Sequence, residues 1–438
     1  MNKINKNLIV KISIPVIIGG MCFGAYKALN VNARDVSTLP VIVNEDSSSL
    51  PSVDVKPLEI LSKKVLSVDE FISKNYGFTG ENEVLLGIGM KPVDFYKKYT
   101  KNSSDMNDKE MNNARDDQLG NIYKLNLSTL EKTPLNINVK SLISDLSPNG
   151  EKINYEDNNK YNIYNLKNNS KIPYDNKSKK ESPNGDGAWS EDGNCFISFF
   201  NDGDLKVYNQ KNNTTKELKI KRDDLWISSI ADFYSEDGND IYFMGDQPKG
   251  KTGSMDFNIQ RQGIFKVNSN TNDIEKVFVL PYSDHTSKGK NKNSGLTGDF
   301  KVLDKGNKIL FDGLISGEAG TYIYDVNSKK FYNVIPHTFK SKEGEYGIFS
   351  WISPDESKIV YGAPDYEDNK KTHWNLYAAK ISGNTITGKI CIAKDYFPHR
   401  LSWSNDSKKV VFFNEINEVK KNGFSIVEKS EVNVITFK

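Results

Sequence analysis

Three histidines, His285, His373 and His399, are the residues of this sequence best suited to binding a metal ion. A zinc site in a protein draws on several histidines or cysteines that recur at short, fixed spacings. These three come from separate segments of the chain, and no paired spacing links them. The pattern therefore predicts solvated loop histidines, with no metal and no cofactor.

Two charged segments suggest ligands of another kind. Residues 365–368, Asp-Tyr-Glu-Asp, carry carboxylates of the type that coordinates calcium, but they lack the spacing of an EF-hand loop. The lysine-rich residues 288–292 are typical of a mobile loop that meets anionic polymers weakly. Both segments are predicted to form solvated surface.

Two tryptophans, Trp226 and Trp374, are better candidates for contact with a partner, because tryptophan is enriched at the energetic centres of interfaces. Both flank segments that we expect to be long loops. The candidate partner contacts are Trp226, His285, Tyr366, His373, Trp374, His399 and Arg400.

The length and composition limit the kind of fold that must position these residues. A chain of 438 residues exceeds a single compact core of roughly 100–200 residues, so it is either several domains or one repeat array. Aromatic residues make up 11% of the chain, which favours β structure. The net charge is only +2, so nucleic acid is not expected as a partner.

The N-terminus has the pattern of a targeting segment. Lys3, Lys6 and Lys11 precede an apolar run over residues 12–26, an order that places the N-terminus inside the cell and the rest outside. Two interpretations stay open: an uncleaved signal-anchor that spans the membrane, or a signal peptide cleaved near Val31-Asn32-Ala33. We expect residues 1–30 to be this segment, 31–57 to be a stalk, and 58–438 to be the folded body.

A short turn motif recurs through that body. Copies are Leu146-Ser147-Pro148-Asn149-Gly150, Trp189-Ser190-Glu191-Asp192-Gly193, Tyr234-Ser235-Glu236-Asp237-Gly238, Ile352-Ser353-Pro354-Asp355-Glu356 and Trp403-Ser404-Asn405-Asp406-Ser407. Degraded copies are Leu303-Asp304-Lys305-Gly306 and Thr79-Gly80-Glu81-Asn82. The serines at 147, 190 and 235 are 43 and 45 residues apart, a period typical of β-propeller blades.

Each copy of the motif is followed by a predicted β-strand. Asn-Gly and Asp-Gly tolerate the positive φ of tight turns, and an apolar run comes directly after them. These runs are 152–155, 195–200, 240–244, 308–311, 358–361 and 409–413. A second apolar-aromatic run and a closing strand complete four short strands per unit, which make one blade.

The turn motif followed by Lys-Ile-x-Tyr/Phe resembles the WD40-like (PD40-type) repeat of TolB-like propellers, which are bacterial proteins. The same repeat occurs in the propeller halves of prolyl-oligopeptidase-type peptidases. The resemblance covers residues 66–438 and implies an all-β propeller of four-stranded antiparallel blades, but it implies no particular function. Seven motif positions favour seven blades; six remains the alternative, because TolB-type propellers commonly have six.

The repeats give the predicted propeller two unlike faces. The tight turns join first to second strands on one face, while long insertions such as 101–120, 245–263 and 362–373 lie on the other. Trp189, Trp351 and Trp403 end first strands and are expected to pack between blades. Loops on a rigid scaffold are where binding residues gather, so we expect the long-loop face to meet a partner.

Catalysis is not expected from these residues. No Gly-x-Ser-x-Gly nucleophile elbow occurs, and the repeats run nearly to Lys438, which leaves no room for a hydrolase domain. The sequence thus predicts a non-catalytic, exported, membrane-anchored binding or scaffolding propeller with a protein partner at the cell envelope. The alternative is a propeller that binds a glycan or peptide at its central channel, with hydrolase activity there.

Overall fold

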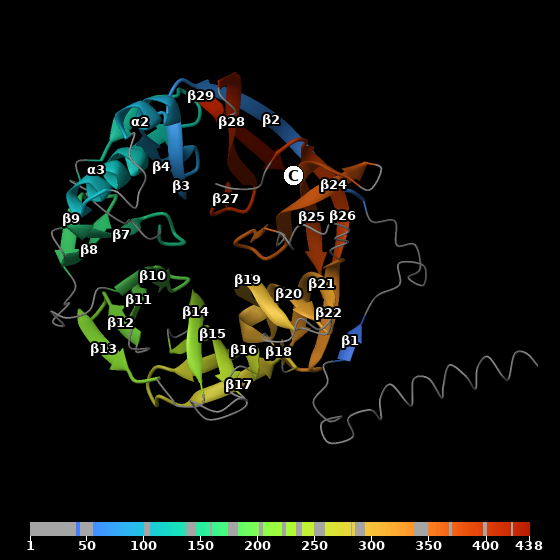
Figure 1. Ribbon diagram of the computed structural model, residues 1–438. Coiled ribbons are helices and arrows are strands. Elements are labelled where there is room, and N and C mark those ends of the chain that lie inside the picture. Colours follow the sequence, from blue (N-terminus) through green and yellow to red (C-terminus); the bar gives the residue numbers. More distant parts are fainter. Residues whose placement is uncertain are drawn as a thin grey trace, which may run out of the picture. The chain divides into compact units, whose positions relative to one another are not determined.

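Antiparallel sheets of three to five strands follow one another along the chain and form the seven blades of a β-propeller. Figure 1 shows these sheets arranged as a ring. Residues 42–438 form one compact unit. The computed structural model describes residues 41–43, 56–99, 106–135, 137, 146–157, 160–173, 183–200, 205–220, 225–233, 239–248, 259–281, 283–284, 294–336, 349–367, 370–396, 401–421 and 424–438.

The first three blades run in chain order from the inner strand outward. Their strands are β3 (Phe71–Gly80), β4 (Glu83–Gly89), β5 (Asn121–Asn126) and β6 (Lys132–Pro134); β7 (Lys152–Asp157), β8 (Lys160–Asn165) and β9 (Ser170–Pro173); β10 (Pro183–Trp189), β11 (Cys195–Phe200), β12 (Leu205–Asn209) and β13 (Thr214–Leu218). In blade 2 an isolated bridge between Leu146 and Ile153 stands at the inner position.

Blades 4 and 5 each carry one additional strand. Their strands are β14 (Trp226–Phe233), β15 (Asp240–Pro248), β16 (Ile259–Asn268) and β17 (Ile274–Val279), with β18 (Ser283–Asp284) beside β16; and β19 (Gly295–Leu303), β20 (Lys308–Ile315), β21 (Glu318–Asp325) and β22 (Lys330–Pro336), with β1 (Val41–Val43) beside β22. A short 3₁₀ helix, η4 (Asp304–Gly306), forms the degraded turn between β19 and β20.

Blades 6 and 7 complete the ring. Their strands are β23 (Ser350–Ile352), β24 (Lys358–Glu367), β25 (Lys370–Ser382) and β26 (Thr385–Ala393); and β27 (Leu401–Trp403), β28 (Lys409–Lys421), β29 (Phe424–Phe437) and β2 (Ile60–Val68). The prediction of seven blades is confirmed. The six predicted second strands are also confirmed as β7, β11, β15, β20, β24 and β28.

The ring closes because β2, from the N-terminal part of the chain, is the outer strand of the last blade. It pairs antiparallel with β29, and Lys63 lies opposite Ile435. Two consecutive lysines on opposite faces of β2 reach the neighbouring blades: Lys63 Nζ donates to Ile392 O (3.2 Å) in blade 6, and Lys64 Nζ donates to Leu127 O (3.0 Å) beside blade 1. Both ends of the repeat array are thereby held in one sheet.

The repeated turn motif has a specific hydrogen-bonding role. In blade 3 the Ser190 hydroxyl donates to Asp192 Oδ1 (2.7 Å) and accepts from the Cys195 amide (2.8 Å). Gly193, at φ +65°, supplies the left-handed conformation that lets the chain reverse between these bonds. Blades 2, 6 and 7 repeat the serine bonds at Ser147, Ser353 and Ser404.

The turns also join neighbouring blades on their face of the propeller. Lys152 Nζ of blade 2 donates to Gly193 O of blade 3 (2.9 Å). The Asp355 amide of blade 6 donates to the Ser407 hydroxyl of blade 7 (2.8 Å). These bonds connect adjacent blades through their turns.

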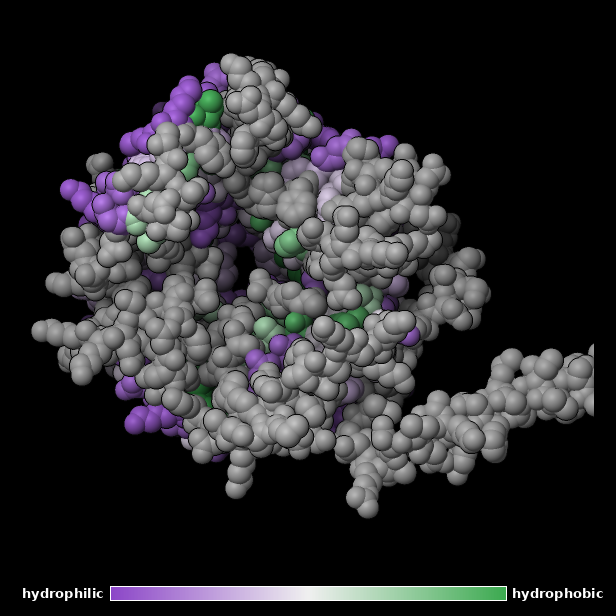
Figure 2. Space-filling view, in the orientation of Figure 1, coloured by the Kyte–Doolittle hydropathy of each residue, from purple (hydrophilic) through white to green (hydrophobic). Residues whose placement is uncertain are grey.

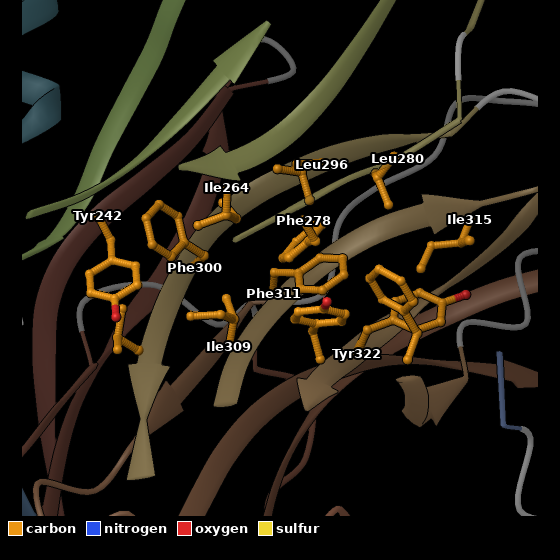
Figure 3. Packing of buried hydrophobic residues seen from close by; sticks show 13 residues of the cluster. Tyr242, Ile264, Phe278, Leu280, Leu296, Phe300, Ile309, Phe311, Ile315 and Tyr322 are labelled. Carbon is orange, nitrogen blue, oxygen red and sulfur yellow. The ribbon is translucent and has the colours of Figure 1, made fainter. Parts of the chain in front are cut away.

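Apolar side chains between adjacent blades form the core. Figure 3 shows the cluster between blades 4 and 5, where side chains of both blades meet. The Phe278 ring lies 4.8 Å from that of Tyr324 and 5.1 Å from that of Phe311, measured between centroids. Trp189 and Trp403 are buried and Trp351 is partly buried in such clusters, as predicted for inter-blade packing.

Two of the expected long loops are regular structure instead. The segment expected as a loop over 101–120 contains the whole of a helix, α3 (Asp108–Leu119), which follows a shorter one, α2 (Pro92–Lys98). A capping box between Asn107 and Glu110 begins α3, and Gly120 ends it. Over 362–373 the chain continues β24 and β25 as one long hairpin, because the ladder extends to the pair Glu367–Lys370.

The predicted N-terminal segment, residues 1–30, lies outside the described residues, as do the motif copy at 234–238 and the lysine-rich residues 288–292. Over the ranges that the structure does describe, no helix combines the length and the apolar character needed to cross a membrane.

Candidate functional site

The inner strands of the blades border an opening at the centre of the ring, which the space-filling view shows (Figure 2). Four of these strands, β3, β10, β14 and β19, shift register against their neighbours. Each shift adds one or two residues to the inner strand and redirects the side chains around it. Strand β3 has three such shifts within ten residues, so the inner surface is most irregular at blade 1.

An aromatic group lies on the inner side of blade 6. Phe349, directly before β23, is 42% exposed, although large apolar side chains elsewhere in the described core are buried. Its ring lies 6.4 Å from that of Trp351, nearly parallel at 21°, and 6.4 Å from that of Trp374 at 56°. The two tryptophans pack against and under Phe349, so one aromatic ring is held open to solvent on a rigid support.

A polar group continues from there across blades 7 and 1. The indole Nε1 of Trp403 donates to Trp351 O (3.0 Å), which ties blade 7 to blade 6. The Asn75 side-chain amide donates to the Ser402 hydroxyl (3.0 Å), which ties blade 1 to blade 7. All four residues stand on inner strands. The inner strands of three adjacent blades are therefore linked side by side.

Strand β3 adds a cation and a phenol to this group. Lys74 Nζ lies 4.8 Å from the centroid of the Tyr76 ring, at cation–π distance. Lys74, Asn75 and Tyr76 are each partly buried, so their polar atoms lie near solvent without being fully immersed in it. We call Lys74, Asn75, Tyr76, Phe349, Trp351 and Ser402 the channel group.

The channel group offers the elements of a small-molecule site. It combines an exposed ring, an amide, a hydroxyl, a phenol and an ammonium on or directly beside the inner strands of blades 6, 7 and 1, and Tyr76 also packs against the cluster between blades 1 and 2. Binding sites commonly pair apolar and aromatic walls with a few placed polar groups. Among the described side chains, no three histidine, cysteine or carboxylate residues lie close enough to hold a metal ion.

Two neighbouring carboxyls at the blade 6 turn, Asp355 and Glu356, have pKa values shifted in opposite directions. Burial alone would raise the pKa of the Asp355 carboxyl, but hydrogen bonds from Ser353 and Ser357 together lower it to about 2. Burial raises the pKa of Glu356, and the Glu191 and Asp304 charges add to this effect while the Asp304 amide opposes it. Both carboxyls belong to the turn that follows β23, whereas Phe349 of the channel group precedes that strand.

The residues singled out in the sequence have different outcomes. Trp374 lies in β25 and is 7% exposed, so a ligand would meet Phe349 before it. Tyr366 and His373 lie on the two strands of the blade 6 hairpin, paired with Lys371 and Asp365. Trp226 begins β14 opposite Asp246. The side chains of these last three are not described, and His285, His399 and Arg400 lie outside the described residues.

The sequence reasoning missed most of the channel group. Phe349 stands two residues before Trp351, and residues two apart on a strand lie on the same face. This spacing was a signal that the two rings lie together. Asn75 and Ser402 gave no signal, because a lone asparagine and a lone serine are common at surfaces. Their pairing depends on the closure of the ring.

Comparison with known proteins shows the fold. No family model matches the chain, and no curated protein matches it. Among solved structures it is similar to an oligogalacturonate lyase in complex with manganese, at 10% identity and a TM-score of 0.50, over 88% of this chain and 99% of that one. It is also similar to an oligogalacturonate lyase from Vibrio parahaemolyticus, at 12% identity and a TM-score of 0.40, over 72% and 96% of the two chains.

The prediction that this chain is not an enzyme is wrong in light of the first comparison. It rested on the absence of a nucleophile elbow and of room for a hydrolase domain. The propeller matches the lyase over 99% of the lyase chain, so in that enzyme the propeller fold is present without a separate hydrolase domain. A propeller of this fold can be a complete enzyme, and the missing domain excludes nothing.

Proposed function

We propose that this chain is a saccharide-active propeller that holds an oligosaccharide against the channel group. The faces of sugar rings carry C–H groups that pack on aromatic rings, and Phe349 is an aromatic ring held open at 42% exposure. The amide of Asn75 and the hydroxyl of Ser402 suit the hydroxyls of the sugar. The fold shared with an oligogalacturonate lyase supports the same class of ligand.

A carboxylated saccharide is favoured over a neutral one. Lys74 brings an ammonium to the inner surface of blade 1, beside the Tyr76 ring. A uronate residue carries a carboxylate that an ammonium attracts, and the effect is larger at a partly buried site than in bulk water. The observation that carries the proposal is the exposure of Phe349, whose ring lies beside those of Trp351 and Trp374.

The proposal is tested by titration calorimetry with galacturonate oligomers of three to six residues, and with neutral glucose oligomers of the same lengths. We expect binding of the galacturonate oligomers and about tenfold weaker binding for Phe349→Ala, or roughly 1.4 kcal/mol. Ile60→Ala, at an exposed apolar residue on the outer strand of blade 7, is the matched control and leaves the affinity unchanged.

Catalysis is measured on the same oligomers as the appearance of new chain ends over time. Cleavage that is lost in Phe349→Ala and retained in Ile60→Ala supports an enzyme acting at the channel group. Equal affinity of the parent chain and Phe349→Ala for every oligomer would contradict the proposed site. If the protein binds members of a peptide library but none of the saccharides, the ligand of the channel is a peptide.

A further inference from the structure

The outer strand of blade 7 exposes apolar side chains that a folded body normally buries. In β2, Leu61 is 59% exposed, Val65 is 51% exposed and Ile60 is 37% exposed. These are three of the five large apolar residues that are exposed in the described part of the chain. The strand pairs with β29 on one side, and among the described residues nothing pairs with its other side. A long apolar edge of this kind is a template for another strand.

The outer edges of five other blades are protected in ways that β2 is not. Strands β6 and β9 are only three and four residues long. Strand β13 has the polar sequence Thr-Thr-Lys-Glu-Leu, with four exposed residues. The edge of β22 is paired with β1. The edge of β26 is contacted by Leu58, whose amide donates to Gly388 O (3.0 Å). Strand β2 is nine residues long, and within the described structure its protection consists of the two lysines at its middle, Lys63 and Lys64.

The charge along β2 indicates what would cover it. The ammonium groups of Lys63 and Lys64 donate to the backbone carbonyls of Ile392 and Leu127, which are neutral. Of the carboxylates just beyond the strand, Glu59 is paired with Lys438 and Glu70 with Lys132, and Asp69 follows directly after Val68. The middle of the edge therefore carries two positive charges on opposite faces, and no described carboxylate pairs with them.

We propose that the free edge of β2 is a docking site for an extended segment of a partner protein in which apolar and acidic side chains alternate. The segment adds to blade 7 as a further strand through main-chain hydrogen bonds, with apolar side chains against Leu61 and Val65. Its carboxylates lie on the other face, beside Lys64, because Lys63 shares the face of Val65, and opposite charges on neighbouring strands stabilise a sheet. This site is independent of the channel group.

A second copy of this chain fits the edge less well. Two β2 strands paired antiparallel about a centre within one residue of Lys64 would bring four lysines together in the middle of the new sheet. Like charges at neighbouring positions of adjacent strands are destabilising. The charge pattern thus favours an acidic partner over self-pairing.

The test uses the full chain and two synthetic decapeptides with blocked ends, one alternating valine and glutamate, the other alternating valine and lysine. Fluorescence anisotropy measures the binding of each peptide. We expect the glutamate peptide to bind at least tenfold more tightly than the lysine peptide. Val65→Thr, which keeps β propensity and an exposed site, should weaken binding at least threefold. Thr215→Ala on the polar edge β13 is the matched control and should leave it unchanged.

Reversing the charge on β2 tests whether its lysine selects the acidic peptide. In Lys64→Glu the preference should shift toward the lysine peptide, provided that the melting temperature shows a folded protein. If that variant does not fold, Lys64→Gln should weaken binding of the glutamate peptide at least threefold. Equal binding of the two peptides, or no effect of Val65→Thr, overturns the proposal. A dimer that Val65→Thr dissociates overturns it in favour of a second copy.

Discussion

The side-chain amide of Asn75 donates a 3.0 Å hydrogen bond to the hydroxyl of Ser402, which lies 327 residues later in the chain. The same Asn75 side chain accepts a hydrogen bond from the Gly77 amide (3.1 Å), within the bulged part of β3. One side chain therefore fixes the local shape of the first inner strand and also joins that strand to the last blade. Asn75 therefore contributes both to the closure of the ring and to the channel group.

Ser402→Ala should destabilise the protein by about 1–2 kcal/mol, because it removes the acceptor of a partly buried amide. It should also weaken binding of galacturonate oligomers, since Asn75 is no longer held in place. Urea denaturation and calorimetry measure the two effects. Ser350→Ala, at a partly buried serine on the inner strand of blade 6, is the control. Unchanged stability in Ser402→Ala would show that the bond contributes nothing to closure.

Two valines of β2 have different roles: one is buried where the ring closes, and the other is exposed at the outer edge. Val68 is 7% exposed and packs in the cluster between blades 7 and 1, whereas Val65 on the same strand is half exposed. Val68→Asp should cost about 3 kcal/mol or more, because it buries an unpaired charge. Val65→Asp should change stability by less than about 1 kcal/mol. The midpoint of urea denaturation distinguishes them, and equal midpoints would contradict the assigned closure.

Features that depend on neighbouring residues were predictable from the sequence. The run 195–200 coincides with β11, because the Ser190–Gly193 turn and the apolar residues after it act locally. The capping box at Asn107 and Glu110 was also a readable signal for α3. It was overlooked because the polar residues of that segment resemble a loop.

Features that depend on distant pairing were not predictable. Nothing in the sequence of β2 indicates that it belongs to the same sheet as β29, because strand pairing leaves no mark on a single strand. The three bulges of β3 also break the simple alternation of inward and outward residues, so the position of Asn75 could not be read from its spacing. The channel group depends on both features.

The targeting segment gives a prediction of its own. We expect an uncleaved anchor, because Lys11 can reach the membrane surface while residues 8–29 cross the bilayer. Expressed in bacterial cells, the chain should stay in the membrane fraction after alkaline washing and should keep residue 1 by intact mass. A variant that lacks residues 1–35 should be recovered in the soluble fraction. A released protein that begins just after Ala33 would instead establish a cleaved signal peptide.

The stability cost of substituting two glycines indicates how tightly the turns pack between blades. Gly150 and Gly383 have similar left-handed backbones, at φ +71° and +62°. A Cβ atom on Gly150 would lie 2.4 Å from Phe78 O of blade 1, whereas one on Gly383 would meet nothing within 4 Å. Gly383→Ala should cost about 1 kcal/mol for the backbone alone. Gly150→Ala should cost about 1–3 kcal/mol more, because of the clash. Equal costs would mean that blades 1 and 2 separate easily at this turn.

The acid stability of the propeller depends in part on Asp355. Its pKa in the folded protein is about 2, below the ordinary value of 3.8, because Ser353 and Ser357 donate to the carboxylate against the opposing effect of burial. A carboxyl with a lowered pKa stabilises the fold above pH 3.8. That stabilisation is lost as the pH falls toward 2, since protonation is then more favourable in the unfolded chain. The side chain is 47% exposed, so solvent screening reduces the effect.

Asp355→Asn should therefore keep the turn at neutral pH but lose less stability between pH 4 and pH 2. Blade 2 supports this expectation, because Asn149 occupies the same place there and accepts the Ser147 hydroxyl bond at 2.7 Å. Melting temperatures measured from pH 2 to pH 7 give the two slopes. Asp355→Ala is the comparison variant and should lower the melting temperature at every pH, because it removes the acceptor altogether. If Asp355→Asn and the parent chain have the same slope between pH 4 and pH 2, the hydrogen-bonded turn does not hold this carboxyl in its charged form.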